Sequence, residues 1–200
     1  MNETFSEADL EPSDDDRRAI RNDRIDRVAA IFAALSVGIV VGGIFALGAC
    51  AAPFVFQMTP APYSGDAMGA AFARFDQIAI TLSVVLLAAE VVRTFLAQKL
   101  RPTPAVRIRR LAGMLFAGCT AYMGLVLSPS INDLHRNGAR RNVGPDGERL
   151  EAIHQRASAV GKAEAALGLV LVGLHVFAIG TPRREEDEDA AAPLPPGPRE

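Results

Sequence analysis

Long uncharged runs dominate the pattern of hydrophobic and polar positions along the chain. No charged residue occurs between Val28 and Gly65, and residues 28–52 are almost entirely apolar until Pro53 interrupts the run. A transmembrane helix needs about 20 apolar residues to cross roughly 30 Å of hydrocarbon. Further apolar stretches of that length cover residues 77–97, 111–132 and 159–181. The sequence therefore predicts four transmembrane helices, with the first ending where the prolines begin.

These four stretches predict an all-α protein built as one four-helix transmembrane bundle over residues 28–181. The flanking segments differ sharply in composition. Residues 1–27 are acidic and then mixed in charge, and residues 182–200 are acidic and then rich in proline. Neither flank has enough apolar residues to bury a core. We therefore expect a disordered leader and a disordered tail, both on the cytoplasmic side.

The third connection is predicted to be partly helical outside the membrane. A turn signal at Pro145-Asp146-Gly147 is followed by apolar residues at helical spacing, namely Leu150, Ile153, Ala157 and Val160. The fourth helix should therefore begin near Glu148 and project outward before it enters the bilayer. On the other side of the turn, residues 131–137 extend the third helix, and Gly138 is a natural stop.

Charge indicates how the bundle sits in the membrane. The chain has a net charge of −2, which gives no footprint for nucleic acid. Twelve Lys and Arg residues flank the side that carries both termini (five in the leader, five in 99–110, two in the tail), against seven on the other side. The positive-inside rule then places both termini in the cytoplasm. Arginine-rich, alanine-rich composition is typical of a bacterial protein, so we expect a multi-pass protein of the bacterial inner membrane.

Small residues recur every fourth position along the first helix. This ladder consists of Ala34, Gly38, Gly42 and Ala46. Small residues let helix backbones approach closely in lipid. The ladder predicts either a dimerisation face or close packing within the chain's own bundle, and the internal alternative is favoured because such patterns are common in membrane helices. The lipid bilayer is the expected partner, together with a homo-oligomer or another membrane protein.

Ionisable residues interrupt two of the apolar stretches. On the second helix, Glu90 follows Asp76 and Ser83 at seven-residue intervals. On the fourth helix, His175 is separated from Gly168 and from His154 by multiples of seven residues. Because a lipid-facing carboxylate is costly, these faces should point into the bundle.

Glu90 and His175 fall at similar depths when counted from the helix ends, and they form the core of a candidate intramembrane site that also includes Arg93, Cys119 and Thr120. A Glu90–His175 pair would relay a proton or bind a cation. The simpler alternative pairs Glu90 with Arg93, its neighbour three residues on, while Arg93 reaches to the interface.

A second group of polar residues forms a candidate outer polar cap: Asp133, His135, His154 and Glu164. His154 and His175 are 21 residues apart, about 31 Å on one continuous helix, so they cannot share a metal. His135, His154 and Asp133 could meet outside the membrane, although no tight ligand spacing supports a metal site. No phosphate loop or nucleophile elbow is present. We predict no catalytic residues and no cofactor.

Several short segments resemble one family of membrane proteins. They are Gly42–Ile44, Ala52–Phe56, Ala67–Phe72, Ser128–Leu134 and Ile153–Ser158. In this order they are similar to the transmembrane protein 205-like family, known in bacteria as a membrane domain of unknown function. The resemblance covers about residues 28–180 and implies a four-helix integral membrane protein without established catalytic residues. His154 and Ser158 depart from the family's usual His-x-x-Ser spacing.

Three hypotheses for the function follow. The leading one is a non-enzymatic membrane protein that acts through packing or through partners. The alternative is a small transporter, or a proton- or cation-binding membrane protein, that uses Glu90 and His175. A membrane oxidoreductase that binds haem or another metal is the weakest, because the chain offers too few intramembrane ligands.

Overall fold

The structure, a computed structural model, describes residues 13–60, 63–96 and 103–180. These residues contain helices only, which confirms the all-α prediction, and four of the continuous helical stretches are long and apolar enough to cross a membrane. The elements in chain order are α1 (Asp14–Phe45), η2 (Ala46–Ala51), α2 (Ala52–Met58), α3 (Tyr63–Leu96), α4 (Pro104–Tyr122), η3 (Met123–Leu127), α5 (Ser128–Arg136) and α6 (Gly144–Gly180). Here η denotes a π-helical turn.

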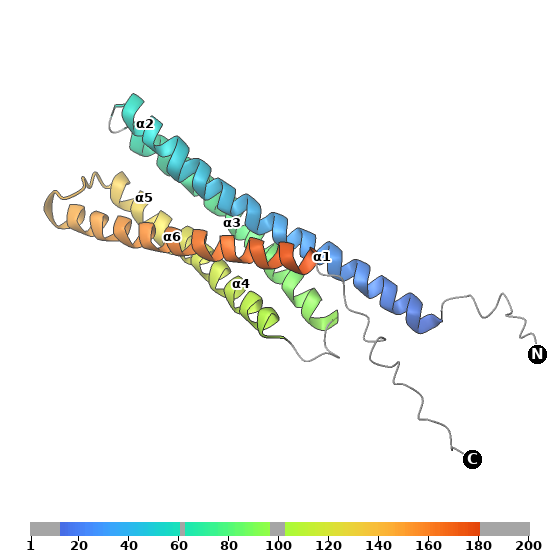
Figure 1. Cartoon of the computed structure of the whole chain (residues 1–200). Coiled ribbons are helices and arrows are strands. Elements are labelled where there is room, and N and C mark those ends of the chain that lie inside the picture. The colour runs from blue at the N-terminus through green and yellow to red at the C-terminus, as the bar shows by residue number, and fades with distance from the viewer. Residues whose placement is uncertain (1–12, 61–62, 97–102, 181–200) are drawn as a thin grey trace, which may run out of the picture.

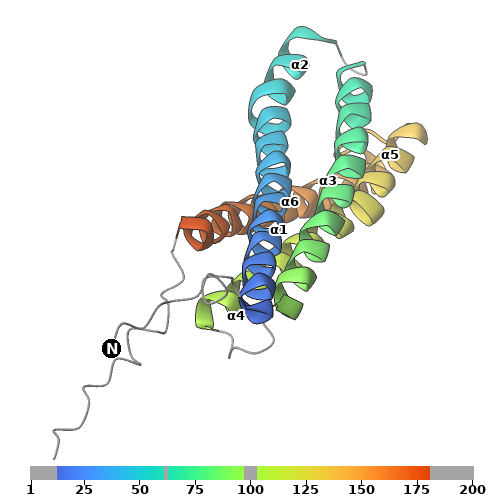
Figure 2. The ribbon, with the colours of Figure 1, turned by 90° about the vertical axis from the view of Figure 1, so that its right-hand side faces the viewer.

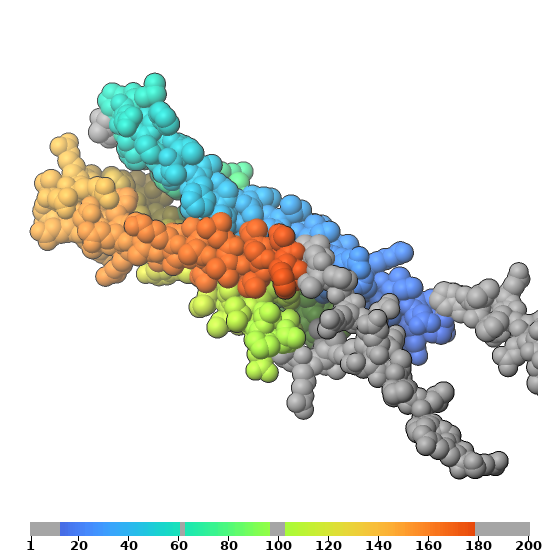
Figure 3. All heavy atoms as spheres, in the orientation of Figure 1, coloured from blue at the N-terminus to red at the C-terminus, as the bar shows by residue number. Residues whose placement is uncertain are grey.

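The long helices form a four-cornered bundle (Figure 1). Around it, α1 packs on α3, α3 on α4, α4 on α6, and α6 on α1. Figure 2 shows α1 and α3 side by side, and in Figure 3 the C-terminal part of α6 lies against α1, whereas its N-terminal part diverges from it. We call the end at which α1 and α4 begin and α3 and α6 end the base. The opposite end, with α2 and the turn from α5 to α6, is the far end.

Two prolines are accommodated within continuous helical stretches, and one of them, Pro53, was predicted to end the first helix. Pro53 and Pro129 each occupy the first turn of a new α-helical segment, directly after the π-helical turns η2 and η3. A proline in a helix interior lacks an N–H and clashes with the carbonyl four residues back. The wider hydrogen-bond ring of a π-helical turn relieves this conflict. The prediction that the first helix ends near residue 52 is therefore wrong.

Helices also begin earlier than their apolar runs. The leader was predicted to be disordered through residue 27, yet α1 starts at Asp14, where Ser13 and Asp16 form a reciprocal capping box. Likewise α3 starts at Tyr63 rather than residue 77. The prediction for the third connection is confirmed, because α5 continues the third helix to Arg136, Gly138 follows with a φ of 80°, and α6 begins at Gly144. The expected tail lies outside the described residues.

An apolar layer crosses the bundle between its base and its middle. Each long helix contributes at least one large, fully buried apolar side chain to it, among them Val37, Leu86, Phe116 and Leu171. Side chains of this size pack at the density of an organic crystal, without water between them. The layer therefore separates the polar groups on its two sides.

Glycines mark where helices approach closely and where they do not. A methyl group at Gly168 of α6 would collide with Val41 and Phe116, so α6 needs glycine there to approach α1 and α4. By contrast, Gly38 and Gly42 are exposed, and no atom lies within 4 Å of where their Cβ atoms would be. Ala46 is also exposed, and Ala34 is half-buried. The prediction that this ladder packs inside the chain's own bundle is therefore wrong.

Candidate functional site

A cluster of charged side chains lies inside the bundle at its base. Helix α3 supplies Glu90 and Arg93, which are one helical turn apart and 6 % exposed each. Both belong to the face of α3 that packs into the bundle, together with Ser83 and Asp76, as the seven-residue spacing predicted. Charged groups buried in a membrane bundle must find partners, because each costs roughly 3 kcal/mol or more when isolated.

Each of the other three long helices supplies one partner. Arg93 Nε donates to Asp26 Oδ1 of α1 at 3.1 Å. Arg93 Nη1 lies 3.2 Å from Nδ1 of His175 on α6. Arg109 Nε of α4 donates to Glu90 Oε2 at 3.2 Å. The cluster therefore ties α3 to α1, α4 and α6 at one level of the bundle.

The hydrogen bonds fix the protonation of the histidine ring. A guanidinium only donates, so Nδ1 of His175 must accept from Arg93, and a neutral ring then carries its proton on Nε2. That Nε2 lies 3.7 Å from Glu90 Oε1. Both atoms are fully buried and neither has a contact of hydrogen-bond geometry among the described residues. The N–H of Arg109 is directed at Oε2, although Arg109 Nε also lies 3.0 Å from Oε1 in the ion pair. The two groups face each other slightly beyond hydrogen-bond distance.

The cluster is electrically balanced. Asp26 and Glu90 offset Arg93 and Arg109, and the remaining member, His175, is neutral in the tautomer described above. One added proton on either acid or on the imidazole would leave a net positive charge in a dry site. A protonated His175 would also set an N–H against the N–H of Arg93. The arrangement of charges is therefore sensitive to a single proton.

The structure brings together three of the five residues predicted for the intramembrane site. Glu90 is within 4 Å of both proposed partners, with Arg93 Nη1 at 3.5 Å and His175 Nε2 at 3.7 Å from its Oε1. Arg109 and Asp26 complete the cluster and were missed. Arg109 was counted as a loop charge, although its spacing from Ala112, Gly113 and Phe116 places it on the buried face of α4.

Thr120 and Cys119 are not part of this cluster, which corrects the sequence prediction. Thr120 is 11 residues beyond Arg109 on α4, about 16 Å along the helix axis. Its hydroxyl instead contacts Oε1 of Glu164, at 2.6 Å. Glu164 was predicted in the outer polar cap, but it is buried within the bundle. Cys119 and Cys50 are both free thiols.

Two residues of the predicted outer cap do meet. The rings of His135 on α5 and His154 on α6 pack edge to face, with centroids 5.9 Å apart. Asp133 is exposed. Within the described part of the chain, no group of three His, Cys, Asp or Glu side chains is arranged to hold a metal ion. The cap is thus a pair of imidazoles in edge-to-face contact, without Glu164.

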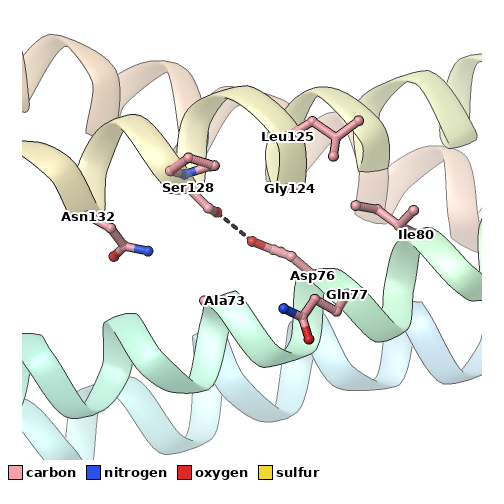
Figure 4. A pocket seen from close by; sticks show the side chains of 9 residues that line it. Ala73, Asp76, Gln77, Ile80, Gly124, Leu125, Ser128 and Asn132 are labelled. Carbon is pink, nitrogen blue, oxygen red and sulfur yellow. Dashed lines mark hydrogen bonds between the residues drawn. The ribbon is translucent and has the colours of Figure 1, made fainter.

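A pocket opens between α3 and the helical stretch of α4, η3 and α5, towards the far end. It has a volume of about 270 Å³, and its polar lining residues are Asp76, Gln77, Ser128 and Asn132. Ser128 Oγ donates to Asp76 Oδ2 at 2.5 Å across the pocket (Figure 4). Gln77 and Leu125 are exposed members of the lining. The pocket and the base cluster lie on opposite sides of the apolar layer.

The sequence of the chain matches a known family over its central part. The sequence model of a domain of unknown function, DUF4149, matches residues 35–140, which are 106 of the 200 residues. The chain belongs to the DUF4149 family. No curated protein and no solved structure matches it. The DUF4149 match includes Glu90, Arg93 and Arg109, whereas Asp26 and His175 lie outside it. Because this family has no assigned activity, the function must be argued from the site itself.

Proposed function

We propose that this protein is a small, non-enzymatic membrane transporter that binds protons at the base cluster, with Glu90 and His175 as the proton-binding pair. The observation that carries the proposal is the contact between Glu90 Oε1 and His175 Nε2, two buried atoms 3.7 Å apart, beside the ion pair in which Arg109 Nε lies 3.0 Å from the same Oε1. An imidazole and a carboxylate so placed can share or exchange one proton.

The proton is the cation that suits this cluster best. Two guanidinium groups lie within 4 Å of Glu90, so a metal ion approaching the carboxylate would meet two positive charges. A proton needs no coordination shell and adds to an existing lone pair. The ring of His175 is enclosed by Arg93 and Glu90. We therefore do not propose a haem there.

Proton binding at the cluster would loosen the base of the bundle. Protonation of Glu90 removes the charge that holds Arg109, and protonation of His175 removes the acceptor that holds Arg93. Because these contacts join α3 to α4 and α6, their loss separates helices at one end only. We infer that the described state is closed at the base, and that proton uptake favours an opening there.

Liposomes test this proposal. Protein is reconstituted with an enclosed pH-sensitive dye, and a potassium diffusion potential, negative inside, is applied. We expect proton uptake above that of empty vesicles, and at least a tenfold slower rate for Glu90→Gln and for His175→Asn. The matched control is Asp133→Asn, which removes an exposed carboxylate on α5 and should transport like the unaltered protein. Uptake equal to that of empty vesicles would exclude a proton pathway.

A second candidate function is self-association through α1. It is favoured by the exposed small-residue ladder, where Gly38 and Gly42 have no atom of this chain near their Cβ positions. Such a groove accepts a second helix closely. Replacing both glycines with leucine should abolish oligomers measured by native mass spectrometry from lipid nanodiscs. Oligomers that persist in the double variant would rule out this face.

We further propose that both termini are cytoplasmic in a bacterial inner membrane, as the distribution of Lys and Arg favours. The resemblance to the transmembrane protein 205-like family is compatible with a four-helix transporter and adds no site residue.

A further inference from the structure

A second acidic site lies on the other side of the apolar layer. Glu164 of α6 is 4 % exposed, and it is 11 residues before His175, about 16 Å nearer the far end. No Lys, Arg or His side chain within the described residues forms an ion pair with it, in contrast to Glu90. The titratable groups whose charges reach it are Asp76 and Cys119, and neither is a cation.

The hydrogen bonds around Glu164 indicate whether its carboxyl group is protonated. Thr120 Oγ1 lies 3.0 Å from the carbonyl oxygen of Phe116 and 2.6 Å from Glu164 Oε1. A hydroxyl has one hydrogen, and a carbonyl oxygen only accepts. When Thr120 donates to Phe116, the second contact is a hydrogen bond only if Glu164 is the donor. A carboxylic acid satisfies both contacts at once, whereas a carboxylate satisfies one of them.

The free energy needed to bury a charged carboxylate also favours the protonated form of Glu164. An unpaired carboxylate buried in a dry interior costs several kcal/mol, and such a group commonly takes up a proton instead. We propose that Glu164 is a proton-binding site, protonated in the closed bundle, which exchanges its proton with the far end through the pocket beside Asp76.

The pocket provides the route because Asp76, one of its lining residues, is near enough to Glu164 for its charge to act there. Thr120, which contacts Glu164, lies in α4 three residues before η3 begins, and Ser128, which contacts Asp76, directly follows η3. Gly124 within that turn packs against the side chain of Asp76. The lining of the pocket reaches the surface at Gln77 (Figure 4). Towards the base, buried apolar side chains intervene along each helix: Leu86 lies between Asp76 and Glu90, Phe116 between Thr120 and Arg109, and Leu171 between Glu164 and His175.

Infrared difference spectroscopy on the full chain in lipid tests the assignment. A buried carboxylic acid gives a carbonyl band separate from those of carboxylates and amides. At neutral pH we expect a band that disappears in Glu164→Gln and persists in Glu90→Gln. On transfer to deuterated buffer, exchange of the acid's proton for deuterium should shift the band. This shift should be slower in Asp76→Asn than in the unaltered protein. A spectrum of Glu164→Gln identical to that of the unaltered protein would overturn the proposal.

A second variant keeps the test decisive if Glu164→Gln fails to fold. Thr120→Val removes the hydroxyl and keeps the shape, so the acid loses its hydrogen-bond acceptor. We expect the band to remain and to move to higher frequency. An unmoved band, or none, would overturn the assignment. The inference concerns Glu164 itself, so a band without proton uptake in liposomes would uphold it and reject the proposed transport.

Discussion

At the scale of single residues, the base cluster is held by a few contacts that cannot be replaced by water. Glu90 is the acid that binds Arg109 and lies beside Arg93 and His175, and all four side chains are at most 8 % exposed. A buried ion pair adds little stability compared with an apolar pair of the same shape, but removing one partner strands the other charge. The balance of Glu90 and Asp26 against Arg93 and Arg109 is therefore the sensitive quantity.

Glu90→Gln should lower the free energy of unfolding by about 3 kcal/mol, because two buried guanidinium groups then share a single carboxylate. The measurement is a denaturation titration with sodium dodecyl sulfate in mixed micelles. Glu151→Gln is the control, since its partner Arg141 is 54 % exposed and such pairs contribute about 0–1 kcal/mol. Equal losses of unfolding free energy in the two variants would show that the buried cluster stabilises the protein no more than an exposed ion pair does.

Two aspartates on α1 offer a matched comparison one turn apart. Asp26 accepts from the buried Arg93, whereas Asp23 pairs with Arg27, whose side chain is 73 % exposed. We expect Asp26→Asn to cost about 1.5–3 kcal/mol, the range for hydrogen bonds to charged groups. Asp23→Asn should cost less than about 1 kcal/mol. The same titration measures both, and a larger loss for Asp23→Asn would argue against the Asp26–Arg93 contact.

At the scale of helices, the sequence predicted which segments cross the membrane better than where each helix begins and ends. Apolar runs report the part of a helix that meets lipid, and α1 and α3 continue beyond that part as polar helices. When the end of a helix is predicted wrongly, the depth of a residue in the bundle counted from that end is also wrong. This error put Thr120 level with Glu90, because α4 begins at Pro104 rather than residue 111. His175 was placed correctly, since α6 is helical through Gly180, where the described residues stop, and the predicted end was residue 181.

The same reasoning explains what the sequence could show of the site. The seven-residue spacing of Asp76, Ser83 and Glu90 identified an inward face, because a helix repeats closely at that interval. It could not identify Arg109 or Asp26 as partners, since both lie at the ends of apolar runs, where charges usually meet water. It also could not show that Glu164 faces Thr120, which depends on the register of α6 against α4.

Helix contacts give two opposite expectations for glycine. Gly168→Ala should lower the free energy of unfolding by about 1–3 kcal/mol, because the added methyl group collides with Val41 and Phe116. Gly38→Ala should be neutral or stabilising by up to about 1 kcal/mol, since alanine favours helix and meets no atom. Unfolding titrations of both variants compare them directly. A destabilised Gly38→Ala monomer would mean that α1 packs differently from the structure.

At the scale of the whole molecule, the buried polar side chains lie in two separate regions of the bundle. The base holds a neutral network that spans all four long helices, and the half towards the far end holds two acids whose described partners are hydroxyls. Buried apolar side chains from all four long helices lie between them. A bundle closed at one end by ion pairs and open at the other through a pocket has the asymmetry that alternating access requires.

Which end of the bundle faces the cytoplasm is a testable prediction. The burial of Arg109 in the cluster removes one charge from the base side, which leaves 12 − 1 = 11 Lys and Arg residues against 7. The positive-inside rule still places the base in the cytoplasm. In a chain with Cys50 and Cys119 replaced by serine, Asn137→Cys should react with an impermeant maleimide added outside intact cells.

The matched variant is Thr103→Cys, at the base, because both positions are exposed and adjoin a helix end. It should react only after the membrane is permeabilised. The reversed pattern would place the base outside, and the pocket beside Asp76 would then take up protons from the cytoplasm. Labelling of both sites in intact cells would contradict a four-span topology, because a single span, Pro104–Arg136, lies between the two positions and places them on opposite sides of the membrane.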